Sequence, residues 1–337
     1  EITNVDFSLR QFVLPLMRGI RARGHEAVGA CAEGPLLASV RGEGFRIVAL
    51  PMARSLSPRA QARAFWALLA FLRAERPDLV HAHMPISGFL ARLAARAAGV
   101  PRIAYTCHGF LFNQQGPAWR RWAALAMEWL GARFTDIYMT VSTEEAEDAR
   151  RLLRVRNAVA VGNGRDPARF RPDPAARALI RAELGVAPDR VVVIVVSRLV
   201  RHKGHPELVE AMRALPEAEL WVVGERLPSD HGERLDRYFA ASGLGARLRL
   251  LGYREDVAAL LASADIFALP SHFVGLPMSV IEAMLAALPV VATRVRGPRE
   301  QVVDGETGIL VPPMQVGPLA AALSRLAADP DLRARMG

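Results

Sequence analysis

A cationic run after a short apolar segment is the clearest chemical signal in the sequence. It reads Ser197-Arg198-Leu199-Val200-Arg201-His202-Lys203-Gly204-His205-Pro206, and a helical pattern begins near its end. A helix N-terminus favours anions, and Arg198 and Lys203 add positive charge there, so the run predicts a diphosphate site. Lys203 is the single lysine among 43 basic residues. A compact ammonium suits a phosphate where a planar guanidinium does not fit; chance survival of one lysine is the alternative.

A Gly-Leu-Pro loop opens a second helix that carries a carboxylate. Residues 270–284 read Pro-Ser-His-Phe-Val-Gly-Leu-Pro-Met-Ser-Val-Ile-Glu-Ala-Met, and Glu282 lies among apolar neighbours. A buried carboxylate needs a partner. Ribose hydroxyls would satisfy it, as they satisfy the acidic residue of dinucleotide-binding folds; an ion pair with a nearby arginine is the alternative.

Short β-rich runs alternate with helical patterns, which is typical of parallel sheets covered by helices. The strands that we expect are 45–50, 79–83, 103–107, 137–141 and 158–161 in the first half, and 191–196, 220–223, 248–251, 266–269, 289–293 and 308–311 in the second. Helical patterns in the first half cover 59–75, 88–98, 118–131 and 144–153. Ligands bind beyond the carboxyl ends of such strands. The residues that follow strands are therefore the candidates: His83, His108, Ser142, Asn163, Arg198, Gly224, Arg254 and Ser271.

Length and patterning indicate an α/β protein with two domains. A chain of 337 residues with 51% hydrophobic content exceeds one ordinary core. Four prolines interrupt the alternation within a charged stretch at 165–190. We therefore predict an N-terminal Rossmann-like domain at 1–165, a connector at 166–190 and a C-terminal Rossmann-like domain at 191–337. NAD chemistry is disfavoured because no strand precedes Gly-x-Gly-x-x-Gly. Since the chain opens on Glu1 rather than Met, we expect truncated ends.

The charge of +9 lies wholly in the first half, with 23 basic and 14 acidic residues in 1–170 against 20 and 20 in 171–337. No aromatic stacking motif accompanies the arginines, so we place an anionic membrane surface or lipid phosphate ahead of nucleic acid. Ordinary solvated helix faces are the alternative. No run of about 20 apolar residues is present, and only Cys31 and Cys107 occur. These features favour a cytoplasmic protein, at most peripheral on the inner face of a bacterial membrane.

The motifs together resemble glycosyltransferase family 4, a group of retaining enzymes, over nearly the whole chain. The resemblance rests on Ser-Arg-Leu-Val-x-x-Lys-Gly, on Leu-Gly-Tyr-Arg-Glu-Asp-Val at 251–257, on Gly-Leu-Pro-x-Ser-x-x-Glu-Ala-Met, and on Gly-Pro-Arg-Glu-x-Val-x-Asp-Gly-x-Thr-Gly at 297–308. His81-Ala82-His83 and Tyr105-Thr106-Cys107-His108-Gly109-Phe110 look like the bacterial members that build capsules, exopolysaccharides and lipid-linked oligosaccharides. The resemblance implies a GT-B fold, with two Rossmann-like domains facing across a cleft.

The resemblance also implies roles for residues on the donor side. Arg198 and Lys203 would grip the diphosphate, Glu282 would hold the ribose, and His108 would lie beside the donor sugar. The backbone around Tyr253 and Arg254 would cradle the base. Further donor-binding positions are Gly224, Val274, Gly275, Leu276, Pro277, Met278 and Ser279.

The substrate implied is a nucleotide diphosphate sugar, with UDP favoured, and the acceptor a glycan or a polyprenyl-linked glycan. No cofactor or metal is required, since fixed cations can stabilise the leaving diphosphate. Asp329-Pro330-Asp331 is interpreted as a solvated turn rather than a manganese site. The resemblance implies same-face attack assisted by the leaving phosphate, so we assign no protein general base. The carboxylate pair of glycosidases is absent from the sequence pattern.

Acceptor-side assignments rest on Asp6, Phe7, Ser8 and His83. Asp6 is interpreted either as a ligand of an acceptor hydroxyl or as a helix cap. The segment 110–131 places Trp119, Trp122 and Trp129 on about one helical face beside arginines, as interfacial helices do. Packing of this face on the sheet is the alternative.

One position departs from the family pattern of two glutamates eight residues apart, because Val274 stands where the first is expected. The interpretations are a changed donor preference, a weakened protein, or a deliberate disabling substitution. Competing functions are a GT-B sugar-nucleotide epimerase, for which no acid and base residues are identified, and a non-catalytic nucleotide- or glycan-binding partner.

Overall fold

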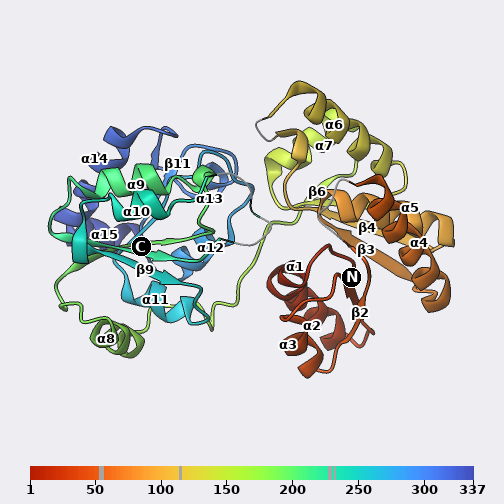
Figure 1. Ribbon diagram of the computed structural model, residues 1–337, viewed down its shortest axis with the longest axis horizontal. Coiled ribbons are helices and arrows are strands. Elements are labelled where there is room, and N and C mark those ends of the chain that lie inside the picture. Colours follow the sequence, from red (N-terminus) through yellow and green to blue (C-terminus); the bar gives the residue numbers. More distant parts are fainter. Residues whose placement is uncertain (53–56, 114–115, 227–229, 231–232) are drawn as a thin grey trace. The chain divides into compact units, whose positions relative to one another are not determined.

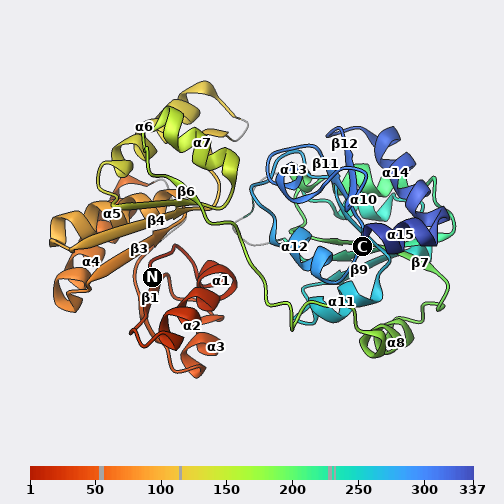
Figure 2. The same cartoon turned by 180° about the vertical axis from the view of Figure 1, so that it is seen from behind.

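The structure, a computed structural model, describes residues 1–52, 57–113, 116–226, 230 and 233–337. The chain divides into two compact units, Glu1–Gly162 and Asn163–Gly337. Each is built on parallel strands with helices beside them (Figures 1 and 2). The segment 166–190, which we expected as a connector, lies within the second unit.

The first unit holds a two-stranded and a four-stranded parallel sheet, in the orders β1-β2 and β3-β4-β5-β6. Its strands are β1 Val28–Cys31, β2 Arg46–Ala49, β3 Leu79–His83, β4 Arg102–Cys107, β5 Ile137–Thr140 and β6 Val159–Ala160. Ile2 links the two sheets, because it forms parallel bridges with both Ala30 and Ala82. The expected strands are confirmed, while β1 and the extended segment at Ile2 were not predicted.

Helices of the first unit enclose two hydrophobic clusters. They are α1 Asp6–Ser8, the π-helix η1 Leu9–Val13, α2 Leu14–Ala22, α3 Leu37–Gly42, α4 Pro58–Glu75, α5 Pro85–Ala98, the 3-10 turn η2 Leu111–Asn113, α6 Ala118–Ala132 and α7 Thr143–Leu152. One cluster lies between η1, α2, α3, β1 and β2, and the other joins α4, α5 and α7 to β3 and β4. Ser142 caps α7, since its hydroxyl accepts a hydrogen bond from the Glu145 N–H at 3.2 Å.

The second unit contains one six-stranded parallel sheet in the order β12-β11-β10-β7-β8-β9. Its strands are β7 Val191–Val196, β8 Ala218–Val223, β9 Leu248–Gly252, β10 Ile266–Leu269, β11 Val290–Thr293 and β12 Gly308–Val311. The central strand β7 is six consecutive β-branched residues, which suits a strand buried on both faces. All six expected strands are confirmed.

Helices cover both faces of this sheet, and each face has its own apolar cluster (Figure 1). The helices are α8 Pro174–Glu183, η3 Arg201–Lys203, α9 His205–Met212, α10 Asp236–Ala240, η4 Gly245–Arg247, α11 Val257–Ser263, α12 Met278–Leu285, α13 Pro298–Gln301, α14 Val316–Ala328 and α15 Pro330–Met336. Asp329 caps α15 by accepting from the Leu332 N–H at 2.8 Å. The Asp-Pro-Asp sequence therefore has a local structural role here.

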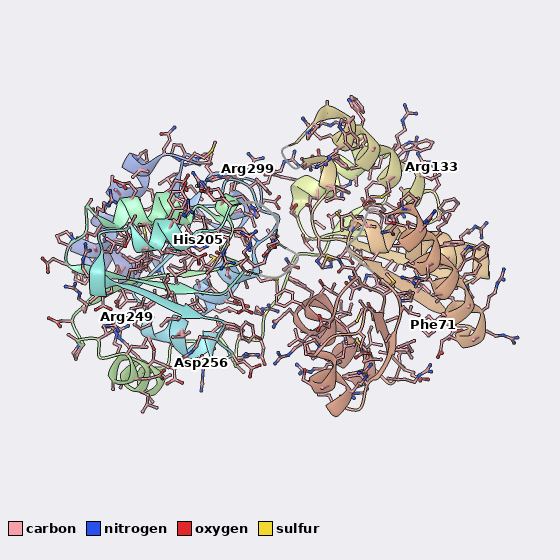
Figure 3. The ribbon with its side chains drawn as sticks, viewed as in Figure 1. Phe71, Arg133, His205, Arg249, Asp256 and Arg299 are labelled. Atoms are coloured by element: carbon pink, nitrogen blue, oxygen red, sulfur yellow. The ribbon has the colours of Figure 1, made fainter. Side chains whose placement is uncertain are left out.

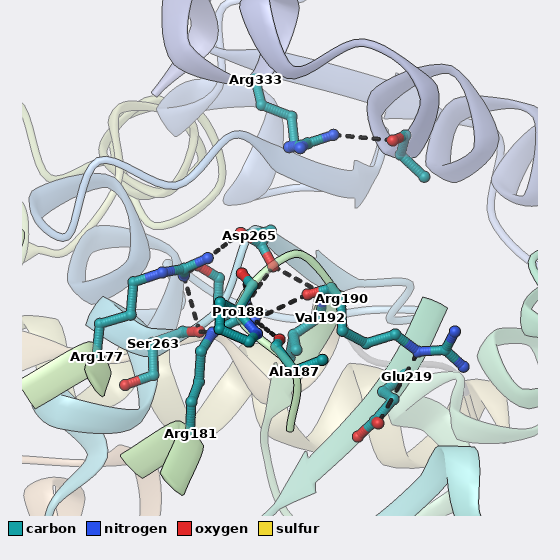
Figure 4. A network of polar contacts seen from close by, with 12 residues as sticks. Arg177, Arg181, Ala187, Pro188, Arg190, Val192, Glu219, Ser263, Asp265 and Arg333 are labelled. Carbon is teal, nitrogen blue, oxygen red and sulfur yellow. Dashed lines mark hydrogen bonds and ion pairs between the residues drawn. The ribbon is translucent and has the colours of Figure 1, made fainter. Parts of the chain in front are cut away.

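Charged contacts hold α8 in the second unit (Figure 4). Arg177 and Arg181 form ion pairs with the two oxygens of Asp265 at 2.8 and 2.7 Å. The same carboxylate accepts a hydrogen bond from the Val192 N–H at 2.8 Å. One acidic residue before β10 thus fastens the proline-rich segment to the start of β7.

Candidate functional site

Three neighbouring strands of the second unit end beside one another, and glycines let the loops that follow them pack closely. Gly224, after β8, has φ +124°, and a Cβ there would lie 2.2 Å from the Ser197 carbonyl oxygen. Gly204, after η3, has φ +77°, and a Cβ there would lie 2.0 Å from the Pro270 carbonyl oxygen. Both conformations and both approaches require glycine. The loops after β7, β8 and β10 therefore form one continuous edge.

Two cations stand at this edge with different surroundings. Arg198 forms an ion pair with Asp230. Lys203 has no hydrogen-bond or ion-pair partner among the residues that the structure describes, although its side chain is largely covered. Burial, and then the charge of Arg198, lower the pKa of Lys203 to about 8. An ammonium held without a counter-charge next to a guanidinium is ready to receive an anion.

Helix α9 begins at His205, two residues after Lys203, and it lacks a side-chain cap at its N-terminus. His205, the first residue of α9 (Figure 3), is buried, and its Nε2 lies 3.1 Å from the Ser197 hydroxyl and 3.1 Å from the Arg198 carbonyl oxygen. Burial lowers the pKa of His205 to about 4, so the ring is neutral near pH 7. It therefore positions the cationic loop without adding charge.

The loop after β10 is tied to the cationic run by ring and backbone contacts. The His202 and Phe273 rings stack with centroids 4.6 Å apart, and the His272 N–H donates to the His202 carbonyl at 2.8 Å. Glu207 accepts from Arg201 at 2.8 Å and lies 3.1 Å from His272 Nε2. The loop after β10 and the turn that carries Lys203 are thus one assembly.

The Gly-Leu-Pro loop leads into the N-terminus of α12. Asn163 donates to the Leu276 carbonyl at 2.9 Å, and Gln301 donates to the Pro277 carbonyl at 3.1 Å. Val274 and Gly275 are half-buried in this loop. Met278 and Ser279 form the first turn of α12, which has no side-chain cap. The backbone N–H groups of this first turn can donate to an anionic or hydroxyl-bearing ligand.

Glu282 on α12 has an arginine partner. Its Oε1 accepts a hydrogen bond from Arg165 Nε at 2.5 Å, and both side chains are largely buried. The arginine alternative raised from the sequence is therefore present in the structure. No hydrogen bond to Glu282 Oε2 is found within the described residues, so a ribose role for Glu282 is compatible with the pair.

Tyr253 and Arg254 follow β9 and differ in how their side chains are held. Tyr253 is 45% exposed. Arg254 is held by Asp256 at 2.6 Å and by Glu183 at 3.0 Å, and these contacts raise the pKa of the guanidinium (Figure 3 labels Asp256). The Arg254 guanidinium is therefore engaged by two carboxylates within the unit.

In the first unit, a carboxylate and three imidazoles form a chain of contacts. His81 and His83 are two residues apart on β3 and share one face of the strand, with ring centroids 4.1 Å apart. Glu1 Oε2 lies 2.7 Å from His83 Nε2 and 3.1 Å from His81 Nδ1. His83 Nδ1 lies 3.2 Å from His108 Nε2. Glu1, His81 and His83 also have the donor types of a metal site, with ligand atoms within 4.8 Å of one another.

The remaining acceptor-side residues have structural contacts. Asp6 accepts hydrogen bonds from the Phe7 N–H at 2.7 Å and the Leu36 N–H at 3.1 Å. Ser8 is buried, and the Phe7 ring lies edge-on to Phe12. Asp6 therefore joins α1 to the segment before α3. The helix-cap interpretation is wrong, since α1 has no side-chain cap, while a contact of Asp6 with an acceptor hydroxyl stays a prediction.

Several site residues had not been singled out. Glu1, Arg165 and Asp230 contact His83, Glu282 and Arg198 respectively. No local pattern marks them, since each meets its partner through the fold. The position of His81 beside His83 could have been predicted, because alternate residues of a strand face the same side.

Both units match known protein families by sequence. Residues 176–337 match the family described as glycosyl transferases group 1, and residues 9–164 match a glycosyl transferase 4-like domain. EpsD of Bacillus subtilis, named as a glycosyltransferase, is 30% identical over 99% of this chain and 88% of its own length. The Escherichia coli UDP-Gal:alpha-D-GlcNAc-diphosphoundecaprenol alpha-1,3-galactosyltransferase is 28% identical over 89% of this chain and 79% of its own.

Solved structures share the fold at lower identity. The Anabaena protein Alr3699/HepE in complex with UDP and glucose aligns with a TM-score of 0.83 and 21% identity, over 99% of this chain and 91% of that one. WaaG, a glycosyltransferase involved in lipopolysaccharide biosynthesis, aligns with a TM-score of 0.76 and 19% identity, over 97% and 89%. With these matches and the geometry of the second unit, the chain is a member of the group 1 glycosyltransferase family with the GT-B fold.

Proposed function

We propose that this protein is a retaining glycosyltransferase that moves a sugar from a UDP-sugar to a glycan or polyprenyl-linked acceptor. The observation that carries the proposal is Lys203, an ammonium without a described partner beside Arg198, at the strand edge where α9 begins. Cleavage of a glycosyl phosphate bond leaves negative charge on the diphosphate, and fixed cations aimed at that charge lower the barrier. Cations of the chain then supply the stabilisation for which other enzymes use a metal.

In this proposal Glu282 binds the ribose, the backbone after β9 cradles the base, and His108 contacts the donor sugar. The diphosphate then takes the place of Asp230, the carboxylate that pairs with Arg198 in the structure. The acceptor hydroxyl attacks the face from which the diphosphate leaves, and a phosphate oxygen takes its proton. The leaving group then acts as the base, so no side chain is assigned that task.

Relatives support the proposed donor and acceptor classes. A UDP donor is supported by the fold-level likeness to a protein solved with UDP and glucose, and by the UDP-Gal in the name of the Escherichia coli relative. A lipid-linked acceptor is supported by the diphosphoundecaprenol in that same name.

Val274 defines the second candidate function, a non-catalytic protein that keeps nucleotide binding. The valine stands eight positions before Glu282 and offers no hydrogen bond to a sugar hydroxyl. Loss of one or two charge-assisted hydrogen bonds of about 1.5–3 kcal/mol each would slow transfer by about 10-fold to more than 100-fold. Nucleotide binding does not depend on this position in the proposal.

A paired experiment tests both candidates. UDP, GDP and ADP are titrated calorimetrically into the protein and its Val274→Glu variant, and turnover is then measured with the matching sugar nucleotides. We expect UDP to bind both forms alike and Val274→Glu to raise sugar transfer or donor hydrolysis. Binding without turnover in either form would favour the non-catalytic role. If no nucleotide binds either form, the donor-site assignment is wrong.

We further propose that α6 rests on an anionic membrane surface. Trp119, Trp122 and Trp129 on this helix are 65%, 69% and 45% exposed, so they do not pack on the sheet as the alternative required. Arg120 and Arg133 lie over Trp119 and Trp129, 5.3 and 4.4 Å from the ring centroids. Exposed indoles beside guanidinium groups suit the headgroup region. No helix within the described ranges is long and apolar enough to cross a membrane.

Vesicle sedimentation tests the membrane surface, with phosphatidylglycerol vesicles set against phosphatidylcholine vesicles. Replacing Trp119 and Trp122 together by alanine is expected to abolish sedimentation with the anionic vesicles. Trp66 on α4 is 64% exposed and provides a matched control, so Trp66→Ala is expected to sediment as the parent protein does. Equal loss in both variants would argue against a specific role for α6.

A further inference from the structure

Arg165 and Glu282 form a largely buried pair within the second unit. The Arg165 Nε–H donates to Glu282 Oε1 at 2.5 Å, and the two side chains are 13% and 10% exposed. Charge-assisted hydrogen bonds are about twice as strong as neutral ones, and covered pairs are screened less than exposed ones. Because both residues belong to the second unit, the contact does not depend on the first.

The segment that carries Arg165 is anchored on both sides of this residue. The Asn163 side chain donates to the Leu276 carbonyl at 2.9 Å. On the other side, the Phe170 N–H donates to the Asp166 carbonyl at 3.1 Å. The Phe170 ring is buried in the apolar cluster that includes residues of β7. The backbone around Arg165 is therefore fixed before any ligand binds.

The pair leaves the second oxygen of Glu282 as an acceptor at the start of α12. Oε1 accepts from Arg165, and no hydrogen bond to Oε2 is found within the part of the chain that the structure describes. Glu282 lies three and four positions after Ser279 and Met278, which open α12 without a side-chain cap. Such residues share a helix face, and helical side chains point toward the N-terminus. A ligand at this end of α12 can therefore reach Oε2.

Arg165 also determines which way the Glu282 carboxylate faces. The last torsion of a glutamate side chain has a broad energy profile, so an unpaired carboxylate can rotate. The bond from Arg165 Nε holds one carboxylate oxygen and directs the other away from the guanidinium. A ligand hydroxyl then meets an acceptor that is already oriented, and binding does not have to order that side chain.

We propose that Arg165 is a positioning residue for ribose recognition, which holds Glu282 Oε1 so that Oε2 accepts a hydrogen bond from a ribose hydroxyl of the bound nucleotide. The identity of the ligand as a ribonucleotide rests on the function proposed above. The opposite role is that Arg165 occupies the carboxylate and keeps the ribose away from it. The two roles predict opposite changes in ribose discrimination when the arginine is replaced.

Deoxynucleotides isolate the ribose contact, because they carry the same phosphate charge as the ribonucleotide. Calorimetry gives Kd for UDP, 2′-deoxy-UDP and 3′-deoxy-UDP, and the ratio of the deoxy value to the UDP value reports the hydroxyl contact. For at least one analogue we expect a ratio of about 10 to 150 in the parent protein, since a hydrogen bond to a charged group is lost. If GDP or ADP binds in place of UDP, its own deoxy analogues are used. Pyrophosphate, which has no ribose, reports the general attraction of anions.

Arg165→Met is expected to lower this ratio about two- to twelvefold, because the ligand must then order the carboxylate on binding. Arg169→Met removes the same charge from an exposed site four residues away and should keep the parent ratio. Both variants should bind pyrophosphate alike. Arg165→Met leaves a buried carboxylate unpaired, so urea titration checks that it is folded. Arg165→Lys keeps the carboxylate paired but fixes its orientation less well, and should lower the ratio to a smaller extent.

Three results would overturn the proposal. The first is a parent protein that binds UDP and both deoxy analogues with equal affinity, which would remove Glu282 from the ribose. The second is an unchanged or higher ratio in folded Arg165→Met, or in Arg165→Lys where the methionine variant does not fold. This second result leaves UDP binding, and with it the proposed function, intact. The third is a parent protein that binds no ribonucleoside diphosphate, which would refute the proposed function as well.

Discussion

Replacement of Lys203 by methionine tests the donor site most directly. The ammonium has no described partner, so its loss disturbs little within the protein. A charge-assisted contact to a phosphate is worth about 1.5–3 kcal/mol. At 1.4 kcal/mol per tenfold, Kd for UDP is expected to rise about 10- to 150-fold at pH 7. Isothermal titration calorimetry measures this directly.

The pKa of about 8 for Lys203 predicts the direction in which UDP affinity changes with pH. A group with that pKa is about nine-tenths protonated at pH 7 and about one-tenth at pH 9. A bound diphosphate favours the ammonium and raises its pKa, so UDP affinity of the parent protein should fall about tenfold between pH 7 and 9. Binding at pH 9 should take up about one proton. The terminal phosphate titrates near pH 6, outside this range.

Two variants serve as controls for this dependence. Lys203→Met has no group that titrates here, so its weaker binding should be flat from pH 7 to 9. Lys203→Arg keeps its charge throughout and should also be flat, with a loss of affinity that reports how poorly a planar guanidinium fits. A flat profile in the parent protein, or normal affinity in Lys203→Met, would refute the assignment.

Two further predictions concern the framework. Arg92 and Glu128 form a fully buried ion pair at 3.0 Å, so Glu128→Ala should lower the free energy of unfolding by about 3–5 kcal/mol in urea titrations. Glu33 pairs with Arg41 at the exposed surface, so Glu33→Ala should leave the free energy of unfolding unchanged. Gly204→Ala would place a methyl group 2.0 Å from the Pro270 carbonyl oxygen; we expect at least tenfold weaker UDP binding by calorimetry, and parent-like affinity would show that this loop does not bind the nucleotide.

The sequence was most informative where a pattern is local. Strand β7 could be predicted because six β-branched residues in a row suit only a buried strand. Strand β1 was missed because Val28–Cys31 contains a glycine and an alanine and has little strand preference of its own. It is stabilised by pairing with β2 and by the bridge to Ile2, contacts that no short window contains.

In the candidate site, too, local patterns could be predicted and contacts between distant residues could not. The loops after β7 and β10 could be found because each is a short motif that precedes a helix: a cationic run after β7 and a Gly-Leu-Pro sequence after β10. An ion pair of Glu282 with an arginine was one of two alternatives, but the arginine could not be identified, since Arg165 lies 117 positions earlier and only the fold brings it near. The contact between His83 and His108 depends on strand register: His83 pairs with Thr106, which places His108 just beyond the end of β4.

The single passage of the chain between the two units at residues 162–163 bears on how such proteins diversify. Every residue that we assign to the diphosphate, ribose and base lies in 163–337, and those assigned to the acceptor lie in 1–162. Each half has hydrophobic cores of its own. A recombination event at this junction would exchange the residues assigned to the nucleotide as a block without cutting a core, whereas His108, assigned to the donor sugar, would be inherited with the acceptor-side residues.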